Sequence, residues 1–176
     1  FEKLNAVPRR SKNEGAVRQW LVSWATEQGY EYRVDNAGNV TVKVPATSGH
    51  ESAPTVVVQG HMDMVCEKRP EVSHDFSSDP IQHVYEDEWV RAAGTTLGAD
   101  NGIAIALAMH LADDEEVVHP PLELLFTVDE ETGLTGALEL PENSLVGRTL
   151  INLDSEEDDS LIVGCAGGRH SSLRIP

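Results

Sequence analysis

Histidine and carboxylate side chains gather in four short clusters along this 176-residue chain. The clusters occupy residues 60–65, 97–102, 127–133 and 152–156, and each follows an apolar run or opens one. Together they contain a histidine, an isolated aspartate that could bridge two cations, a pair of adjacent glutamates and a further aspartate. This set matches the ligands of a hydrolytic site that holds two divalent metal ions.

The first cluster contains His61 and Asp63, which are two residues apart. At the end of an extended strand such residues point to the same side of the sheet. A zinc-bound imidazole usually donates its other N–H group to a carboxylate, which fixes its tautomer. His61 is therefore a candidate metal ligand and Asp63 a candidate for orienting it. Taken alone, the pair would more often be a surface histidine beside an unrelated aspartate.

Asp100 lies between Gly98 and Gly102 at the expected start of a helix, where its two oxygens could join two cations. Taken alone, it would more often be a helix cap. Glu130 and Glu131 follow an apolar run and would point in different directions if the chain were extended there. One of them could then bind metal while the other acts as a general base.

Asp154 ends a further apolar stretch and could complete the shell around the metal held by His61. A calcium-binding loop that starts at Asp154 is the alternative. That loop requires Gly at its sixth position and Glu at its twelfth, which here are Asp159 and Cys165. The remaining histidines lack a strand-end context and are assigned to the surface or to packing: His50, His74, His83, His110, His119 and His170.

Periodicity and turn residues predict the elements that must position these side chains. Ser11 and Glu14 form a capping-box pattern before a helix over residues 17–24, and a second helix is predicted over residues 102–111. Strands are predicted over residues 30–34, 39–44, 55–59, 122–127, 149–153 and 161–164, with a short hairpin ending near residues 89–91.

This alternation of strands and helices predicts an α/β fold with a mixed, mostly parallel sheet and helices on both faces. In such folds, sites form beyond the carboxyl ends of the strands. Three of the four clusters fall at such ends. The sheet would therefore bring them together at one edge.

The composition limits the partners of the chain. It has 30 Asp and Glu residues against 13 Lys and Arg, a formal net charge of −17 that repels phosphate backbones and anionic lipids. We therefore expect no nucleic acid or membrane partner. The apolar stretches are shorter than the roughly 20 residues that cross a bilayer, and a signal-peptide pattern is lacking, which favours a cytoplasmic protein. Cys66 and Cys165 are interpreted as small buried side chains.

Taken together, the four clusters resemble the M20 metallopeptidases, in particular their aminoacyl-histidine (Xaa-His) dipeptidase branch. Residues 1–11, which include Pro8 and Arg9, resemble the opening of that branch. The resemblance is carried by Gly60-His61-Met62-Asp63-Met64-Val65-Cys66, Thr95-Thr96-Leu97-Gly98-Ala99-Asp100-Asn101-Gly102, Asp129-Glu130-Glu131-Thr132-Gly133 and Asn152-Leu153-Asp154-Ser155-Glu156-Glu157.

The resemblance implies a zinc exopeptidase-like catalytic domain that hydrolyses dipeptides, including Xaa-His, by means of a water that bridges two zinc ions. It also implies a cis peptide bond between Asp100 and Asn101. The implied residue roles are these: His61 and Asp154 bind one zinc ion, Glu131 binds the other, Asp100 bridges both, Asp63 orients His61, and Glu130 is the general base. Other divalent metals remain open.

Members of this branch are longer, with an inserted lid domain and a late histidine that completes the second metal site. We therefore expect residues 1–176 to be the N-terminal portion of the catalytic domain, without the lid or the C-terminal catalytic segment, and impaired when isolated. A homodimer is expected through the lid. The alternatives are a tripeptidase or aminoacylase-like amidohydrolase of the same superfamily, or a non-catalytic metal-binding module.

Overall fold

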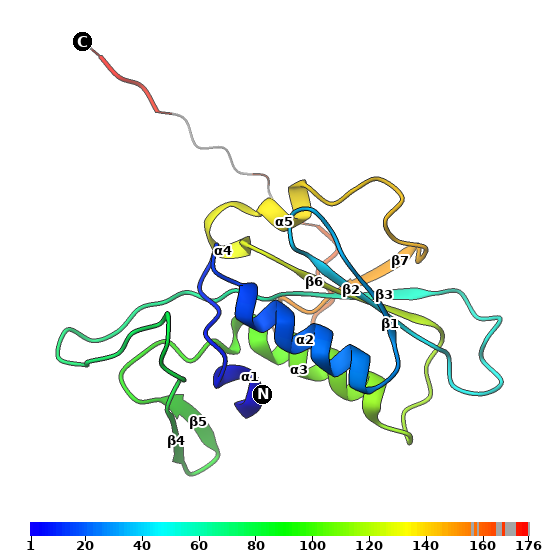
Figure 1. Ribbon diagram of the computed structural model, residues 1–176, viewed down its shortest axis with the longest axis horizontal. Coiled ribbons are helices and arrows are strands. Elements are labelled where there is room, and N and C mark those ends of the chain that lie inside the picture. Colours follow the sequence, from blue (N-terminus) through cyan, green and yellow to red (C-terminus); the bar gives the residue numbers. More distant parts are fainter. Residues whose placement is uncertain (156, 158, 165–166, 168–171, 176) are drawn as a thin grey trace.

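A five-stranded mixed sheet forms the centre of the computed structural model, which describes residues 1–155, 157, 159–164, 167 and 172–175 (Figure 1). Its strand order is β1-β2-β6-β3-β7. The strands are β1 (Glu31–Val34), β2 (Val40–Val44), β3 (Val56–His61), β6 (Leu122–Thr127) and β7 (Thr149–Asn152). The β1–β2 and β2–β6 pairs are antiparallel, whereas β3–β6 and β3–β7 are parallel.

The parallel strands β3, β6 and β7 end at the same edge of the sheet. In the register, His61 lies opposite Thr127 of β6, and Gln59 lies opposite Asn152 of β7. Strand β6 is buried along its whole length, as expected of an apolar strand that is covered on both faces. This register brings three of the four predicted clusters to one edge, which confirms that expectation.

Helices α2 (Gly15–Glu27) and α3 (Ala99–Asp113) cover one face of the sheet. Their apolar side chains share one core with the strands, which includes Val17, Leu21, Ile105, Ala108, Val40, Val42, Leu124 and Phe126. Trp24 Nε1 donates a hydrogen bond to Asp113 Oδ2 over 2.9 Å, and the Tyr30 hydroxyl donates to the Ala112 carbonyl. These bonds fix α2 and the start of β1 to the C-terminal end of α3.

The opposite face of the sheet meets α5 (Thr135–Leu138) and the chain that leads from it to Gly147. Asn39 donates a hydrogen bond from Nδ2 to the Gly136 carbonyl over 2.8 Å. The buried Glu123 carboxylate accepts the backbone N–H groups of Val146 and Gly147. The predicted mixed sheet between helical layers is confirmed, with parallel and antiparallel pairs in equal number.

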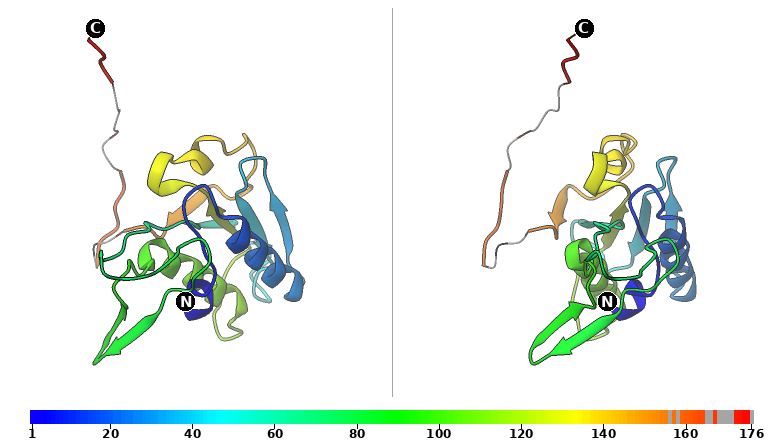
Figure 2. Two further views of the ribbon diagram at one scale, coloured as in Figure 1. Left: turned by 60° about the vertical axis from the view of Figure 1, so that its left-hand side comes forward. Right: turned by 90° about the vertical axis from the view of Figure 1, so that its left-hand side faces the viewer.

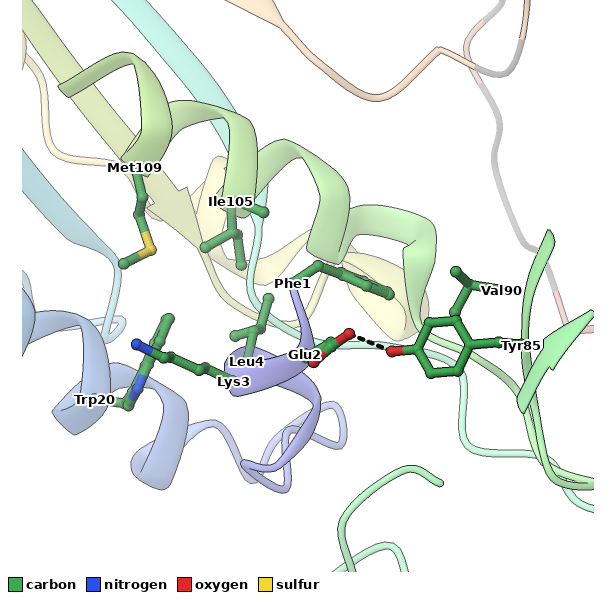
Figure 3. A pocket seen from close by; sticks show the side chains of 10 residues that line it. Phe1, Glu2, Lys3, Leu4, Trp20, Tyr85, Val90, Ile105 and Met109 are labelled. Carbon is green, nitrogen blue, oxygen red and sulfur yellow. Dashed lines mark hydrogen bonds between the residues drawn. The ribbon is translucent and has the colours of Figure 1, made fainter. Parts of the chain in front are cut away.

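The remaining elements lie around the sheet: α1 (Glu2–Asn5), α4 (Glu130–Gly133) and the hairpin of β4 (His83–Glu86) and β5 (Trp89–Ala92), which projects from the body in Figure 2. A pocket of about 570 Å³ separates the hairpin from α1, α2 and α3 (Figure 3). The Tyr85 hydroxyl donates a hydrogen bond to the Glu2 carboxylate across it. None of the helices in the described residues is long and apolar enough to cross a membrane.

The structure contradicts the predicted cap of α2 and the last predicted strand. Ser11 does not cap α2, whose N-cap is Glu14 without a side-chain capping bond; the Ser11 hydroxyl instead donates to Asp63. Residues 161–164 do not form a strand. No described strand pairs with them, and their apolar side chains are exposed, by 93% at Leu161 and 100% at Val163.

Candidate metal centre

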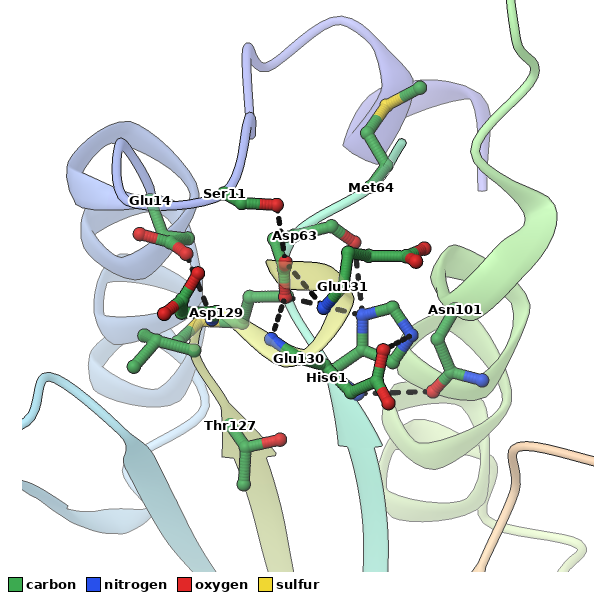
Figure 4. A network of polar contacts seen from close by, with 12 residues as sticks. Ser11, Glu14, His61, Asp63, Met64, Asn101, Thr127, Asp129, Glu130 and Glu131 are labelled. Carbon is green, nitrogen blue, oxygen red and sulfur yellow. Dashed lines mark hydrogen bonds and ion pairs between the residues drawn. The ribbon is translucent and has the colours of Figure 1, made fainter. Parts of the chain in front are cut away.

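The candidate site lies at the edge of the sheet where the parallel strands end (Figure 4). His61 is the last residue of β3, Glu130 begins α4 directly after β6, and Asp154 follows β7. Asp100 comes from the first turn of α3. All six residues that the sequence singles out meet in this region.

The Nε2 atom of His61 is the centre of the group. It lies 2.9 Å from Asp100 Oδ1, 3.9 Å from Glu130 Oε2 and 3.9 Å from Asp154 Oδ1. The His61 side chain is 1% exposed, whereas that of Asp100 is 58% exposed. The imidazole therefore forms the buried floor of a site whose carboxylates reach toward solvent.

Asp63 is fully buried and supports both His61 and the glutamate pair. Its Oδ1 lies 3.3 Å from His61 Nδ1 and accepts the Glu130 N–H over 3.0 Å. Its Oδ2 accepts the Ser11 hydroxyl over 2.7 Å and the Glu131 N–H over 3.2 Å. Burial alone would raise the pKa of Asp63, but these hydrogen bonds stabilise its charge and lower the pKa to about 2.

Because Asp63 accepts both backbone N–H groups, Glu130 and Glu131 begin a helical turn, α4. The expectation of an extended chain at this pair is therefore wrong. Asp129, before them, has a left-handed backbone with φ of 51° and accepts the Thr132 and Thr135 hydroxyls. These bonds hold the glutamate pair at the end of β6.

The donor atoms fit a metal ion. Ligand atoms of His61, Asp100 and Glu131 all lie within 4.8 Å of one another. Glu131 Oε1 is buried and has no hydrogen-bond partner among the described residues. Burial raises the pKa of Glu131, and the Asp100 charge raises it further; burial likewise raises the pKa of Glu130. A divalent cation would offset this repulsion and accept a lone pair from the buried oxygen.

Asn101 connects the other parts of the site. Its Oδ1 accepts the His61 N–H over 3.1 Å, and its Nδ2 donates to Asp154 Oδ1 over 3.0 Å and to the Leu153 carbonyl over 2.9 Å. The bond between Asp100 and Asn101 is cis, as the resemblance implies. A Cβ at Gly60 would lie 2.5 Å from Asn101 Oδ1, so only glycine lets α3 approach β3 this closely.

Sequence reasoning missed the supporting roles of Arg9, Ser11 and Asn101. Ser11 was assigned to a helix cap, and Arg9 lies far from the clusters in sequence; neither carries a local signal of its contact with Asp63. Arg9 is buried, which lowers its pKa to about 10 even though nearby carboxylates, led by Asp63, oppose that shift. Among the histidines that the sequence assigns to the surface or to packing, His83 contacts Asn5 and stacks on Phe1. Cys165 and His170, whose positions the sequence also predicts, lie outside the described residues.

The geometry predicts a protonated His61 in the metal-free chain. Burial lowers its pKa, but the hydrogen bond and charge of Asp63 outweigh burial and raise it to about 9. The folded pKa thus exceeds the unfolded value of about 6.5, so the charged imidazole stabilises the fold fully below about pH 6.5, and this contribution is lost as the pH rises through 9.

Measurement of the His61 ring signals by NMR across pH 5–10, with metal removed, tests this value. Asp63→Asn should lower the pKa of His61, whereas Asp114→Asn, at the far end of α3, should leave it unchanged. A His61 pKa near 6.5 in the unaltered chain would contradict the described contacts.

Comparison with known proteins shows which family the chain resembles. Residues 57–168 match the family described as peptidase family M20/M25/M40. The chain is 47% identical over 168 residues to the cytosol non-specific dipeptidase of Escherichia coli K12, an alignment that covers 96% of this chain and 35% of that protein. A protein of Bacillus subtilis called YqjE is 25% identical over 89% of the chain and 42% of its own length.

Solved structures give the same result. The fold matches the aminoacylhistidine dipeptidase of Vibrio alginolyticus with a TM-score of 0.87 and 49% identity, over 90% of this chain and 32% of that one. It matches the aminopeptidase PepT of Bacillus cereus with a TM-score of 0.73 and 27% identity, over 89% and 42% of the two chains. The chain spans about a third of the length of the two dipeptidases. By these matches it belongs to peptidase family M20/M25/M40.

Proposed function

We propose that this chain is the metal-binding, N-terminal portion of the catalytic domain of a zinc-dependent dipeptidase. The observation that carries the proposal is the buried Glu131 Oε1, which has no hydrogen-bond partner in the part of the chain that the structure describes and whose residue forms a group with His61 and Asp100. Buried carboxylate oxygens are normally hydrogen-bonded, so an oxygen without such a partner beside other potential ligands supports a cation site.

In this proposal His61 and Asp154 hold one zinc ion, Glu131 holds the other, and Asp100 contacts both. When bound, the zinc ions act as Lewis acids toward the peptide carbonyl and lower the pKa of water toward about 7. Asp63 keeps the His61 proton on Nδ1, which leaves Nε2 free to act as a ligand.

Glu130 is the proposed general base. It is adjacent in sequence to the proposed ligand Glu131, and its Oε2 lies 3.9 Å from His61 Nε2, the same distance as Asp154 Oδ1. Burial raises its pKa, and so do the charges of Asp154 and Asp63, which favours a carboxylate able to accept a proton from water and return it to the leaving amine.

Short peptides are the proposed substrates. One relative is named an aminoacylhistidine dipeptidase and the other a non-specific dipeptidase, so Xaa-His is the first dipeptide to test within a broader set. The E. coli relative is named for the cytosol, which supports a cytoplasmic location. A homodimer remains a proposal that follows from the resemblance alone.

Zinc should bind this chain once tightly and once weakly. Three proposed ligands, His61, Asp100 and Asp154, surround one position, whereas Glu131 and Asp100 alone serve the other. Titration calorimetry on the metal-free chain measures both events. His61→Ala should abolish the tight event, and His50→Ala, on the surface, should preserve it. Two equally tight sites, or an unchanged isotherm for His61→Ala, would show that the ligand set is wrong.

Replacing Glu130 and replacing Glu131 should have different effects. Both variants are made in a form of the protein that is extended to the length of the E. coli relative. Glu130→Gln should keep its zinc content but lower kcat by about 100- to 10,000-fold, because the general base is lost. Glu131→Gln should lower zinc occupancy as well. Metal analysis beside steady-state kinetics separates the two. Near-normal turnover by Glu130→Gln would refute its role.

The 176-residue chain alone should be nearly inactive. Carboxylates predominate around the proposed metal positions, so they would repel the free carboxylate of a dipeptide unless further residues bring cations to it. Histidine release from an Xaa-His dipeptide, with zinc present, should appear only in the extended form. Full activity of the short chain would contradict this expectation, and inactivity of both forms would favour a non-catalytic metal-binding module.

A further inference from the structure

Arg9 is a buried cation directly behind the candidate metal centre. It lies between α1 and α2, and its side chain is 1% exposed. Its Nη1 donates to the Met62 carbonyl over 3.2 Å and to the Asp63 carbonyl over 3.1 Å. The same Asp63 carbonyl lies 3.1 Å from His61 Nδ1. The guanidinium and the imidazole therefore meet at one oxygen atom.

The other arm of the guanidinium reaches the start of α3. Nη2 donates to the Gly98 carbonyl and, over 3.2 Å, to Asn5 Oδ1. Gly98 is the N-cap of α3, with φ of 72°, and stands two residues before Asp100. A Cβ at Gly102 would lie 2.8 Å from Nη2. The first turn of α3 thus packs directly against the guanidinium.

Arginine suits this position because its two terminal nitrogens carry four N–H groups in a fixed plane, and here four oxygen atoms accept from them. A lysine ammonium is a single point and cannot span the same acceptors. The charge is also matched, since Asp63 and Asp100 lie close enough to favour the charged guanidinium.

We propose that Arg9 is a positioning residue of the metal centre: by bonding the carbonyls of Asp63 and Gly98 at once, it fixes the end of β3 relative to the start of α3, and so sets the affinity for metal. This inference rests on the proposed metal site. It concerns the spacing between His61 and Asp100, which come from those two elements.

Zinc titration of the metal-free 176-residue chain tests the proposal with Arg9→Lys and Arg9→Met. Arg10→Met is the matched control, because the neighbouring side chain is exposed. Arg9→Lys keeps the charge but loses the planar fork, so zinc affinity should fall about 10- to 100-fold, as for other groups that orient ligands. Arg9→Met should lose at least as much, and Arg10→Met should bind like the unaltered chain.

Two further measurements separate positioning from general stability. Thermal unfolding without metal identifies the variants that are folded at the titration temperature. The visible spectrum of bound Co²⁺ reports coordination geometry, and it should change in Arg9→Lys but not in Arg10→Met.

Unaltered zinc affinity in the folded Arg9 variants would overturn the proposal. Failure of both variants to fold would overturn it too, because Arg9 would then serve the fold and not the site. If the unaltered chain bound no zinc, the proposed metal centre itself would fall together with this inference. Equal binding by the chain and its variants would count against Arg9 alone.

Discussion

The side chain of Asp63 is fully buried, and the residues of the site are arranged so that they stabilise its negative charge. Its two oxygens face His61 Nδ1, the Ser11 hydroxyl and the N–H groups of Glu130 and Glu131. A buried charge without such partners would be strongly unfavourable. The same contacts that satisfy Asp63 thereby orient the imidazole and turn the chain after β6 into α4.

The parallel register makes these contacts available. Because β3, β6 and β7 run the same way, the residues after each strand emerge at one edge, and α3 adds Asp100 from the side. Asn101 then joins His61 to Asp154. Burial raises the pKa of both glutamates, and the neighbouring carboxylates raise it further, so this arrangement is electrostatically costly without a cation. The contacts that fold this edge therefore also position the candidate metal ligands.

The sequence could predict the parts that local patterns encode. The β-branched run before His61 and the apolar run before Asp129 each predicted a buried strand, and the turn at residues 35–38 separated β1 from β2 as expected. The resemblance also predicted the cis bond after Asp100.

Long-range contacts could not be predicted in this way. Ser11 and Arg9 each contact the segment after β3 through bonds that span more than 50 residues, and no local pattern marks them. Glu130 and Glu131 form a helical turn in which Asp63, distant in sequence, accepts their N–H groups. Residues 161–164 have the composition of a strand, but a strand also needs a neighbour, and none of the described strands pairs with them.

The central claim is that the His61, Asp100, Glu131 and Asp154 side chains form a metal centre. Anomalous diffraction at the zinc absorption edge, from crystals of this chain grown with zinc, tests it most directly. The account predicts a strong anomalous peak within bonding distance of His61 Nε2 and of oxygens from Asp100 and Asp154, where zinc is expected to bind tightly. An anomalous map without a peak between these side chains, or with zinc bound only at other surface carboxylates, would contradict it.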